Sequence, residues 1–316
     1  MVINVHAHLA HRNMWSDTFW DFVAENFSKA LGVPKETMVE QMLPVYWVSN
    51  ADTFVQVMDA AGVEKALVMG VDYGVMPMVG EAKWSVEEMN QWVAKQADEY
   101  PDKLAALCAV DPRRGERAVK LVEKAVEEWG MKGVKLHPTA GYYPDDPVCY
   151  PLYEKCVELG VPIHSHTAAT ITAPMESKYA DPIHLDSVAA KFPDLKIILI
   201  HFGGLAWNQK ATEIMTSRPN IYAEISGHQV AAVGMPQHWL SNLRGILDVH
   251  ALLGPPLRDR IMFGTDWPYL ITVLGDDAWV NHIKNLPEKG KEHGIKFTQE
   301  EVKKILSENA KKILNL

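Results

Sequence analysis

The chain has 316 residues, 47% of them hydrophobic, so it is long enough to bury one large core or two ordinary ones. Its formal net charge is -9 and its basic residues are scattered, which argues against nucleic acid or an anionic membrane surface as a partner. No apolar run approaches the length of a membrane span, and no basic segment precedes an apolar one at the N-terminus, so we predict neither a membrane span nor a signal peptide.

Segments typical of strands and helices alternate along the whole chain, and no linker rich in glycine, serine or proline divides it. The predicted strands are 2–5, 65–71, 104–110, 133–136, 161–166, 196–200, 221–225 and 260–265. The predicted helices are 52–61, 86–100, 116–129, 149–159, 185–192, 205–216, 239–253 and 299–314. Because the central strands are apolar on both faces, as in a parallel sheet, we predict an α/β fold, a (β/α)₈ TIM barrel formed by one domain over 1–316. A doubly wound sheet is the structural alternative.

The segment 9–50, directly after the first strand, is predicted to be a helical insertion rich in aromatic residues. These are Trp15, Phe19, Trp20, Phe22, Phe27, Tyr46 and Trp47. Their helical spacing indicates packing, since large rings usually report burial. The position of the segment also makes it a candidate lid or wall of a substrate pocket.

The chain contains three cysteines, Cys108, Cys149 and Cys156, and their spacing is not that of a metal site. An odd and small number of cysteines is typical of a reducing compartment. We therefore expect a cytoplasmic protein in which all three thiols are structural.

The first strand ends in His6-Ala7-His8. Side chains alternate along a strand, so both imidazoles point the same way and could bind one metal ion. In a chain with 13 histidines, however, such a pair arises by chance about once in every two chains of this length, so the motif decides nothing alone.

Other ionisable residues also lie at the ends of predicted strands. They are Lys135 and His137, His164 and His166, His201, Glu224, and Asp266. In a (β/α)₈ barrel these strand ends meet on the one face where such folds build their sites. We therefore expect a site at this face.

Three imidazoles and one carboxylate suit zinc, or a similar divalent ion, with one open position. We predict His6, His8, His166 and Asp266 as the ligands, with one ion rather than two and manganese as the alternative to zinc. His166 could instead be a core histidine bonded to a hydroxyl, and Asp266 could be a turn or helix cap before Pro268.

The remaining polar residues at the strand ends have less specific expected roles. His201, before two glycines, is placed to act as a general acid or base or to polarise a carbonyl. His164 lies one layer deeper than His166, as a core residue or as the true ligand in its place. Lys135 could be carbamylated to bridge a second metal or could form an ion pair, and Glu224 could be structural or part of the site.

Candidate pocket residues lie at the same face of the predicted barrel. His137 is one, and Lys178, Tyr142 and Tyr143 lie on loops of that face, from which they could contact a substrate.

Six segments resemble the amidohydrolase superfamily, and specifically its amidohydrolase 2 branch, which includes aminocarboxymuconate-semialdehyde and resorcylate decarboxylases and several lactone hydrolases. They are VINVHAH, KGVKLHP, VPIHSHTA, FPDLKIILIHFGG, MFGTDWP and ENAKKILNL, in the order of the family. The resemblance implies metal ligands at His6, His8, His166 and Asp266, a catalytic histidine at His201, and a homodimer.

The decarboxylases of this branch typically hold the substrate carboxylate with an arginine from the region after the first strand. The present chain offers only Arg12 there, and its next arginine is Arg113. Lys178, or an arginine from a partner subunit, could take that place. This departure favours hydrolysis over decarboxylation.

The first hypothesis is therefore hydrolysis of a small-molecule ester, lactone or amide by a metal-activated water. Asp266 would transfer the proton of the water to the leaving group, and His201 would stabilise the oxyanion. The alternative is non-oxidative decarboxylation of an aromatic or muconate-like acid. A metal-binding protein without turnover is a third possibility, against which the presence of His201 argues.

Overall fold

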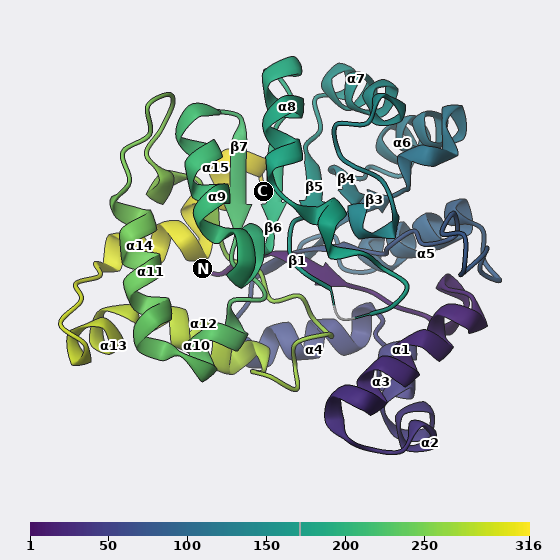
Figure 1. The fold of residues 1–316 in the computed structure, drawn as a ribbon, viewed down its shortest axis with the longest axis horizontal. Coiled ribbons are helices and arrows are strands. Elements are labelled where there is room, and N and C mark those ends of the chain that lie inside the picture. Colours follow the sequence, from purple (N-terminus) through teal and green to yellow (C-terminus); the bar gives the residue numbers. More distant parts are fainter. Residues whose placement is uncertain (171) are drawn as a thin grey trace.

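The computed structural model describes residues 1–170 and 172–316 of the chain. Its eight strands are parallel and follow one another in chain order around a barrel (Figure 1). They are β1 (Ile3–His8), β2 (Lys65–Met69), β3 (Leu104–Ala109), β4 (Val134–Leu136), β5 (Ile163–His166), β6 (Ile197–Ile200), β7 (Ile221–Glu224) and β8 (Ile261–Met262). The barrel predicted from the sequence is confirmed.

The barrel closes through backbone hydrogen bonds between β1 and the segment that contains and follows β8. The Val5 N–H donates to the carbonyl of Phe263 at 2.9 Å, and the Asp266 N–H donates to the carbonyl of His6 at 2.9 Å. Closure therefore brings the two predicted ends of the metal site together, although they lie 258 residues or more apart in sequence (266 minus 8).

Helices surround the strands, as Figure 1 shows. They are α1 (Asp17–Leu31), α2 (Lys35–Thr37), α3 (Leu43–Trp47), α4 (Ala51–Ala61), α5 (Val86–Asp98), α6 (Glu116–Glu127), α7 (Tyr150–Leu159), α8 (Ile183–Lys191), α9 (Gly204–Ser217), α10 (Gln229–Gly234), α11 (Pro236–Asp248), α12 (Asp276–Lys284), α13 (Leu286–Glu292), α14 (Gln299–Lys303) and α15 (Asn309–Leu314). One turn of π-helix, Lys304–Glu308, joins α14 to α15, so the predicted closing helix is helical throughout. No helix in the described ranges is both long and apolar enough to cross a membrane.

Several boundaries differ from the predicted ones by a few residues, and three of these differences have identifiable reasons. β1 continues to His8, because Ala7 and His8 pair with Val68 and Met69 of β2 after a shift in register that follows Asn4. β8 has only two residues, since the chain after it turns and Thr265 and Asp266 both donate to the carbonyl of His6. α11 begins at Pro236, a residue favoured in the first turn of a helix, which is before the predicted start.

The predicted insertion after β1 is helical and forms α1 to α3, at one side of the barrel in Figure 1. α1 begins after Ser16, whose hydroxyl accepts a hydrogen bond from the Phe19 N–H, and it ends at Gly32 in the left-handed conformation. Four aromatic side chains of the whole insertion are buried, namely Trp15, Phe19, Trp20 and Tyr46, while Phe22, Phe27 and Trp47 are half-buried. The insertion is thus packed onto the barrel through these rings.

Candidate metal centre

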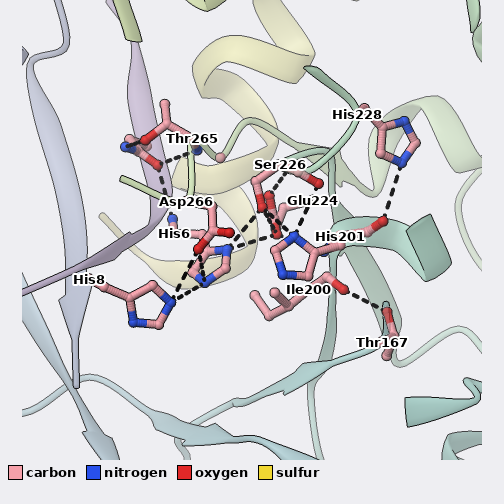
Figure 2. Close-up of polar contacts among 12 residues, drawn as sticks. His6, His8, Thr167, Ile200, His201, Glu224, Ser226, His228, Thr265 and Asp266 are labelled. Atoms are coloured by element: carbon pink, nitrogen blue, oxygen red, sulfur yellow. Dashed lines mark hydrogen bonds and ion pairs between the residues drawn. The ribbon is translucent and has the colours of Figure 1, made fainter. Parts of the chain in front are cut away.

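β1 places His6 and His8 on the same side of the strand, and both side chains are buried. Their Nε2 atoms lie 2.9 Å apart (Figure 2). Asn4 fixes this end of the strand, because its Oδ1 accepts the N–H groups of His6 and Thr265 at 3.1 and 3.2 Å. The local sequence thus brings two imidazole nitrogens to one point, as the alternation of strand side chains predicts.

Asp266 approaches the same point from the segment after β8. Its Oδ1 lies 3.3 Å from Nε2 of His8 and 3.6 Å from Nε2 of His6. The residue has a left-handed φ of 58°, a conformation that aspartate tolerates better than most residues. Burial raises the pKa of this carboxyl to about 8, although the positive charge of Lys135 lowers it.

His201 follows β6 in a tight left-handed turn. His201, Phe202, Gly203 and Gly204 all have positive φ. Thr167 fixes the turn, since its hydroxyl donates to the carbonyl of Ile200 at 2.6 Å and accepts the Gly203 N–H at 3.0 Å. The turn points the ring of His201 toward His6, with 5.1 Å between the ring centroids.

Among the described residues, His6, His201 and Asp266 form a possible metal site, because one ligand atom from each lies within 4.8 Å of the others. The residues fit a divalent ion in chemistry as well as in position, since imidazole nitrogen and carboxylate oxygen are common ligands of zinc and manganese. Burial is the largest effect on the pKa of His6, His8 and His201, and it lowers each well below its ordinary value. The three imidazoles are therefore neutral, the form that binds metal.

His166, which the sequence predicts as a ligand, borders this group but is turned differently. Its Nε2 lies 2.8 Å from the carbonyl of Ala168, and its ring stacks on His137 with centroids 4.2 Å apart. The ring of His166 also meets the edge of His201 at 4.8 Å. Its role as a ligand stays a prediction.

Lys135 is the buried cation of the centre. Its Nζ lies 3.2 Å from Nε2 of His6, and burial lowers its pKa to about 8. The neighbouring strand places His164 beside it in register. Both ring nitrogens of His164 are buried, and neither has a hydrogen-bond partner in the described part of the chain. His164 is fully buried beside Lys135, and its role as a ligand in place of His166 stays a prediction.

Glu224 and Ser226 lie at the end of β7 and support the histidines from behind. The Glu224 carboxylate accepts the N–H groups of His201 and Ser226, at 2.8 and 2.6 Å, and the Ser226 hydroxyl at 2.7 Å. The sequence left the role of Glu224 open and did not single out Ser226. The one sequence signal for Ser226 is its position two residues after Glu224, the acidic residue that ends β7.

The predicted pocket cations lie in ion pairs of their own. Arg12 pairs with Asp17 at 2.8 Å and lies over the ring of Trp47, while the exposed Lys178 pairs with Glu176 at 2.6 Å. Within the described ranges we find no contact of either cation with the residues of the centre. Their role in substrate binding is an untested prediction.

The predicted pocket tyrosines lie farther along the same face. Tyr142 is buried beneath the guanidinium of Arg113, and Tyr143 packs against His184 and Tyr179. Their contact with a substrate also stays a prediction.

An aromatic wall covers the centre, and the sequence identified only part of it. We define it as Trp15, Phe19, Tyr46, Tyr73 and Tyr269. Tyr269 packs on His8 at 5.2 Å between centroids, and Tyr73 packs edge-on against His137 at the same distance. Because Tyr73 and Tyr269 come from loops after β2 and β8, no periodic sequence pattern predicts their place in the wall. The wall leaves the histidines of the centre buried.

Gly264 is required by the packing between Glu224 and His6. A Cβ atom at this position would lie against the Glu224 carboxylate and 3.1 Å from Cβ of His6. We expect Gly264→Ala to lower the free energy of unfolding by about 1–3 kcal/mol, as overpacking does, measured by urea denaturation. Gly245→Ala is the matched control, since Gly245 lies within α11 with no atom near its added Cβ, and it should not destabilise. Equal losses in both variants would contradict the expectation.

The comparisons with known proteins agree with this architecture. The model of the amidohydrolase family matches residues 3–316. A 2-keto-4-carboxy-3-hexenedioate hydratase of a Sphingobium species is 29% identical over 151 residues, which are 40% of this chain and 44% of the hydratase. The match thus spans less than half of that relative. A 2-amino-3-carboxymuconate-6-semialdehyde decarboxylase of Dictyostelium discoideum is 20% identical over 74% of this chain and 70% of its own.

Solved structures of low sequence identity share the fold. A 5-carboxyvanillate decarboxylase from Novosphingobium aromaticivorans, complexed with manganese and 4-hydroxy-3-methoxy-5-nitrobenzoic acid, has a TM-score of 0.66 at 17% identity, over 100% of this chain and 96% of that one. A probable 2-pyrone-4,6-dicarboxylic acid hydrolase from Acinetobacter baumannii has a TM-score of 0.63 at 15% identity, over 100% and 99%. The curated relatives thus include a hydratase and a decarboxylase, and proteins named as a decarboxylase and a hydrolase share the fold. Because the family model covers nearly every residue, the chain belongs to the amidohydrolase 2 family.

Proposed function

We propose that this chain is a metal-dependent carboxy-lyase, which removes carbon dioxide from a small unsaturated or aromatic acid without oxidation. The observation that carries the proposal is the convergence of three buried histidines, His6, His8 and His201, with the partly buried Asp266 at the carboxyl ends of the strands. We expect His6, His8 and Asp266, with His166 after rotation away from Ala168, to hold one divalent ion. Manganese is favoured over zinc by the decarboxylase of the same fold that binds it.

Decarboxylation is favoured over hydrolysis by the relatives and by burial. Of the two curated relatives described above, the decarboxylase is matched over the larger share of the chain, and a second decarboxylase shares the fold. The histidines of the centre, His6, His8 and His201, are also at most 5% exposed, and a carboxylate that loses its hydration shell among them parts more readily with carbon dioxide. Exclusion of water does not help a reaction that consumes water.

Hydrolysis of a lactone or ester is the second candidate, and one observation favours it. The Asp266 carboxylate lies 3.3 Å from Nε2 of His8, so it adjoins the position at which a nucleophilic water would be bound. The hydrolase of the same fold is consistent with this reaction.

The residues of the chain have distinct roles in the favoured reaction. A bound divalent ion would polarise an oxygen of the substrate and orient the molecule. His201, whose Nδ1 is held by Ser226 on the other side of the ring, would take up a proton from solvent at Nε2 and pass it to the carbon that loses its carboxylate. Tyr73, Tyr269 and Trp15 would pack against the plane of the substrate.

The proposal is tested by assaying protein loaded with manganese, and separately with zinc, against aromatic and muconate-like acids and against lactones and esters. We expect release of carbon dioxide from at least one acid, and loss of that release when a chelator removes the metal. Hydrolysis of lactones with no carbon dioxide from any acid would favour the second candidate. Protein that retains neither metal would reject both.

A further inference from the structure

The hydroxyl of Ser226 contacts three buried groups of the centre at once. Its Oγ lies 2.9 Å from Nδ1 of His6, 2.8 Å from Nδ1 of His201 and 2.7 Å from Oε1 of Glu224 (Figure 2). Ser226 itself is fully buried. One side chain from the end of β7 therefore joins the histidine of β1 to the histidine of β6.

The hydrogen atoms in this network can be assigned from the neighbouring acceptors. Nδ1 of His201 also lies 3.2 Å from the carbonyl of Ser226, and a carbonyl can only accept. Nδ1 of His6 likewise lies 3.2 Å from Oε1 of Glu224. Each Nδ1 must therefore carry the ring proton. The hydroxyl accepts from both rings with its two lone pairs and donates its one proton to Glu224, so every donor in the network has an acceptor.

We infer that Ser226 is a positioning residue, which holds His6 and His201 in the tautomer with hydrogen on Nδ1 and so leaves Nε2 of both rings without a hydrogen. The inference rests on the metal centre proposed above, since these unprotonated Nε2 atoms are the ones that would meet a metal ion or a substrate. Partners of this kind behind a ligating histidine fix its tautomer and its orientation.

The backbone around Ser226 keeps the hydroxyl in place. The Ser226 N–H donates to Oε2 of Glu224 at 2.6 Å, which fixes the residue against the carboxylate that it also contacts through its side chain. Gly227 follows with a φ of 81°, and a Cβ there would lie 3.2 Å from Nδ1 of His201. The turn after β7 thus leaves just enough room for the ring of His201 against Ser226.

The matched control is provided by Ser165, a second buried serine of the barrel. It lies between His164 and His166 on β5, and its hydroxyl has no hydrogen-bond partner in the described residues. Ser226→Ala and Ser165→Ala remove the same atoms from similar surroundings. Only the first removes the bonds to the imidazoles.

Two measurements on each variant test the inference. In metal-free protein labelled with ¹⁵N-histidine, ring-proton correlation spectra report the tautomer, with signals assigned through His6→Gln and His201→Asn. We expect the Nδ1–H form for both histidines in the parent and in Ser165→Ala. In Ser226→Ala we expect mixed tautomers, because each Nδ1 keeps only an acceptor at 3.2 Å. Titration with manganese should give an affinity about 10- to 100-fold lower in Ser226→Ala, with less than about twofold change in Ser165→Ala.

Ser226→Thr, which keeps the hydroxyl, should restore both readouts. If Ser226→Ala does not fold, Ser226→Cys replaces it, because a thiol is a weak acceptor of similar size. An Nε2–H tautomer at either histidine in the parent would overturn the inference, as would identical behaviour of Ser226→Ala and Ser165→Ala. The spectra need no metal, so a parent that binds neither manganese nor zinc would reject the proposed function while the tautomers still decide the role of Ser226.

Discussion

Protein with Asp266→Asn is expected to lose its bound metal and to turn over substrate at least about 10³-fold more slowly than the parent. Once metal binding has removed its proton, the Asp266 carboxylate contributes a negative charge within 3.6 Å of both His6 and His8, and an amide oxygen is a poorer ligand for a divalent ion. A bound metal is worth several kcal/mol to the transition state, and each 1.36 kcal/mol corresponds to about a tenfold change in rate. Asparagine tolerates the left-handed backbone at this position, so the fold should be preserved.

Metal analysis of protein purified without chelator, together with the turnover number, checks this expectation. Asp276→Asn is the control, since Asp276 is also a buried acid, at the start of α12, but lies outside the group of His6, His201 and Asp266. The control should keep its metal and its activity. Full metal occupancy in Asp266→Asn would contradict the proposed ligand set.

The second large effect is expected at His201. With His201→Asn we predict that turnover falls about 10²- to 10⁴-fold while the metal is retained, because a group that transfers a proton in the transition state contributes a factor of that size. Asparagine again suits the positive φ of this position, which is 66°. The retained metal is what separates a proton-transfer residue from a ligand.

His166→Ala is the paired variant for this test, and it should lose the metal. In the structure His201 shares the ligand group with His6 and Asp266, whereas Nε2 of His166 contacts the carbonyl of Ala168. If His201→Asn loses the metal and His166→Ala retains it, then His201 is the metal ligand and His166 is the residue left to transfer the proton. Metal content and turnover measured on the same preparations decide between the assignments.

The barrel and the strands that carry the site could be predicted because both depend on regular periodicity. Buried parallel strands give continuous apolar runs, as in 197–200, and the polar residues that end such runs must meet at one face of the barrel. His6, His8, His201 and Asp266 were found in this way. β8 departs from this regularity, because only two of the six residues predicted for it pair as a strand.

Side-chain orientation and contacts between loops could not be predicted from the sequence. The turn of His166 toward Ala168 depends on a rotamer, which strand position does not determine. Arg12 and Lys178 choose their partners, Asp17 and Glu176, through the tertiary arrangement of loops. Tyr73 is a single aromatic residue in an irregular loop, where no repeating pattern of apolar residues indicates that its side chain is buried.

The left-handed residues of the centre imply a conflict between stability and activity. His201, Phe202 and Asp266 hold positive φ values that cost L-residues roughly 1–2 kcal/mol each, a cost that glycine would avoid. Two of the three are residues to which we assign chemistry. Selection for thermal stability alone would thus favour replacing His201 and Asp266, and an inactive descendant of this chain could be more robust than its parent.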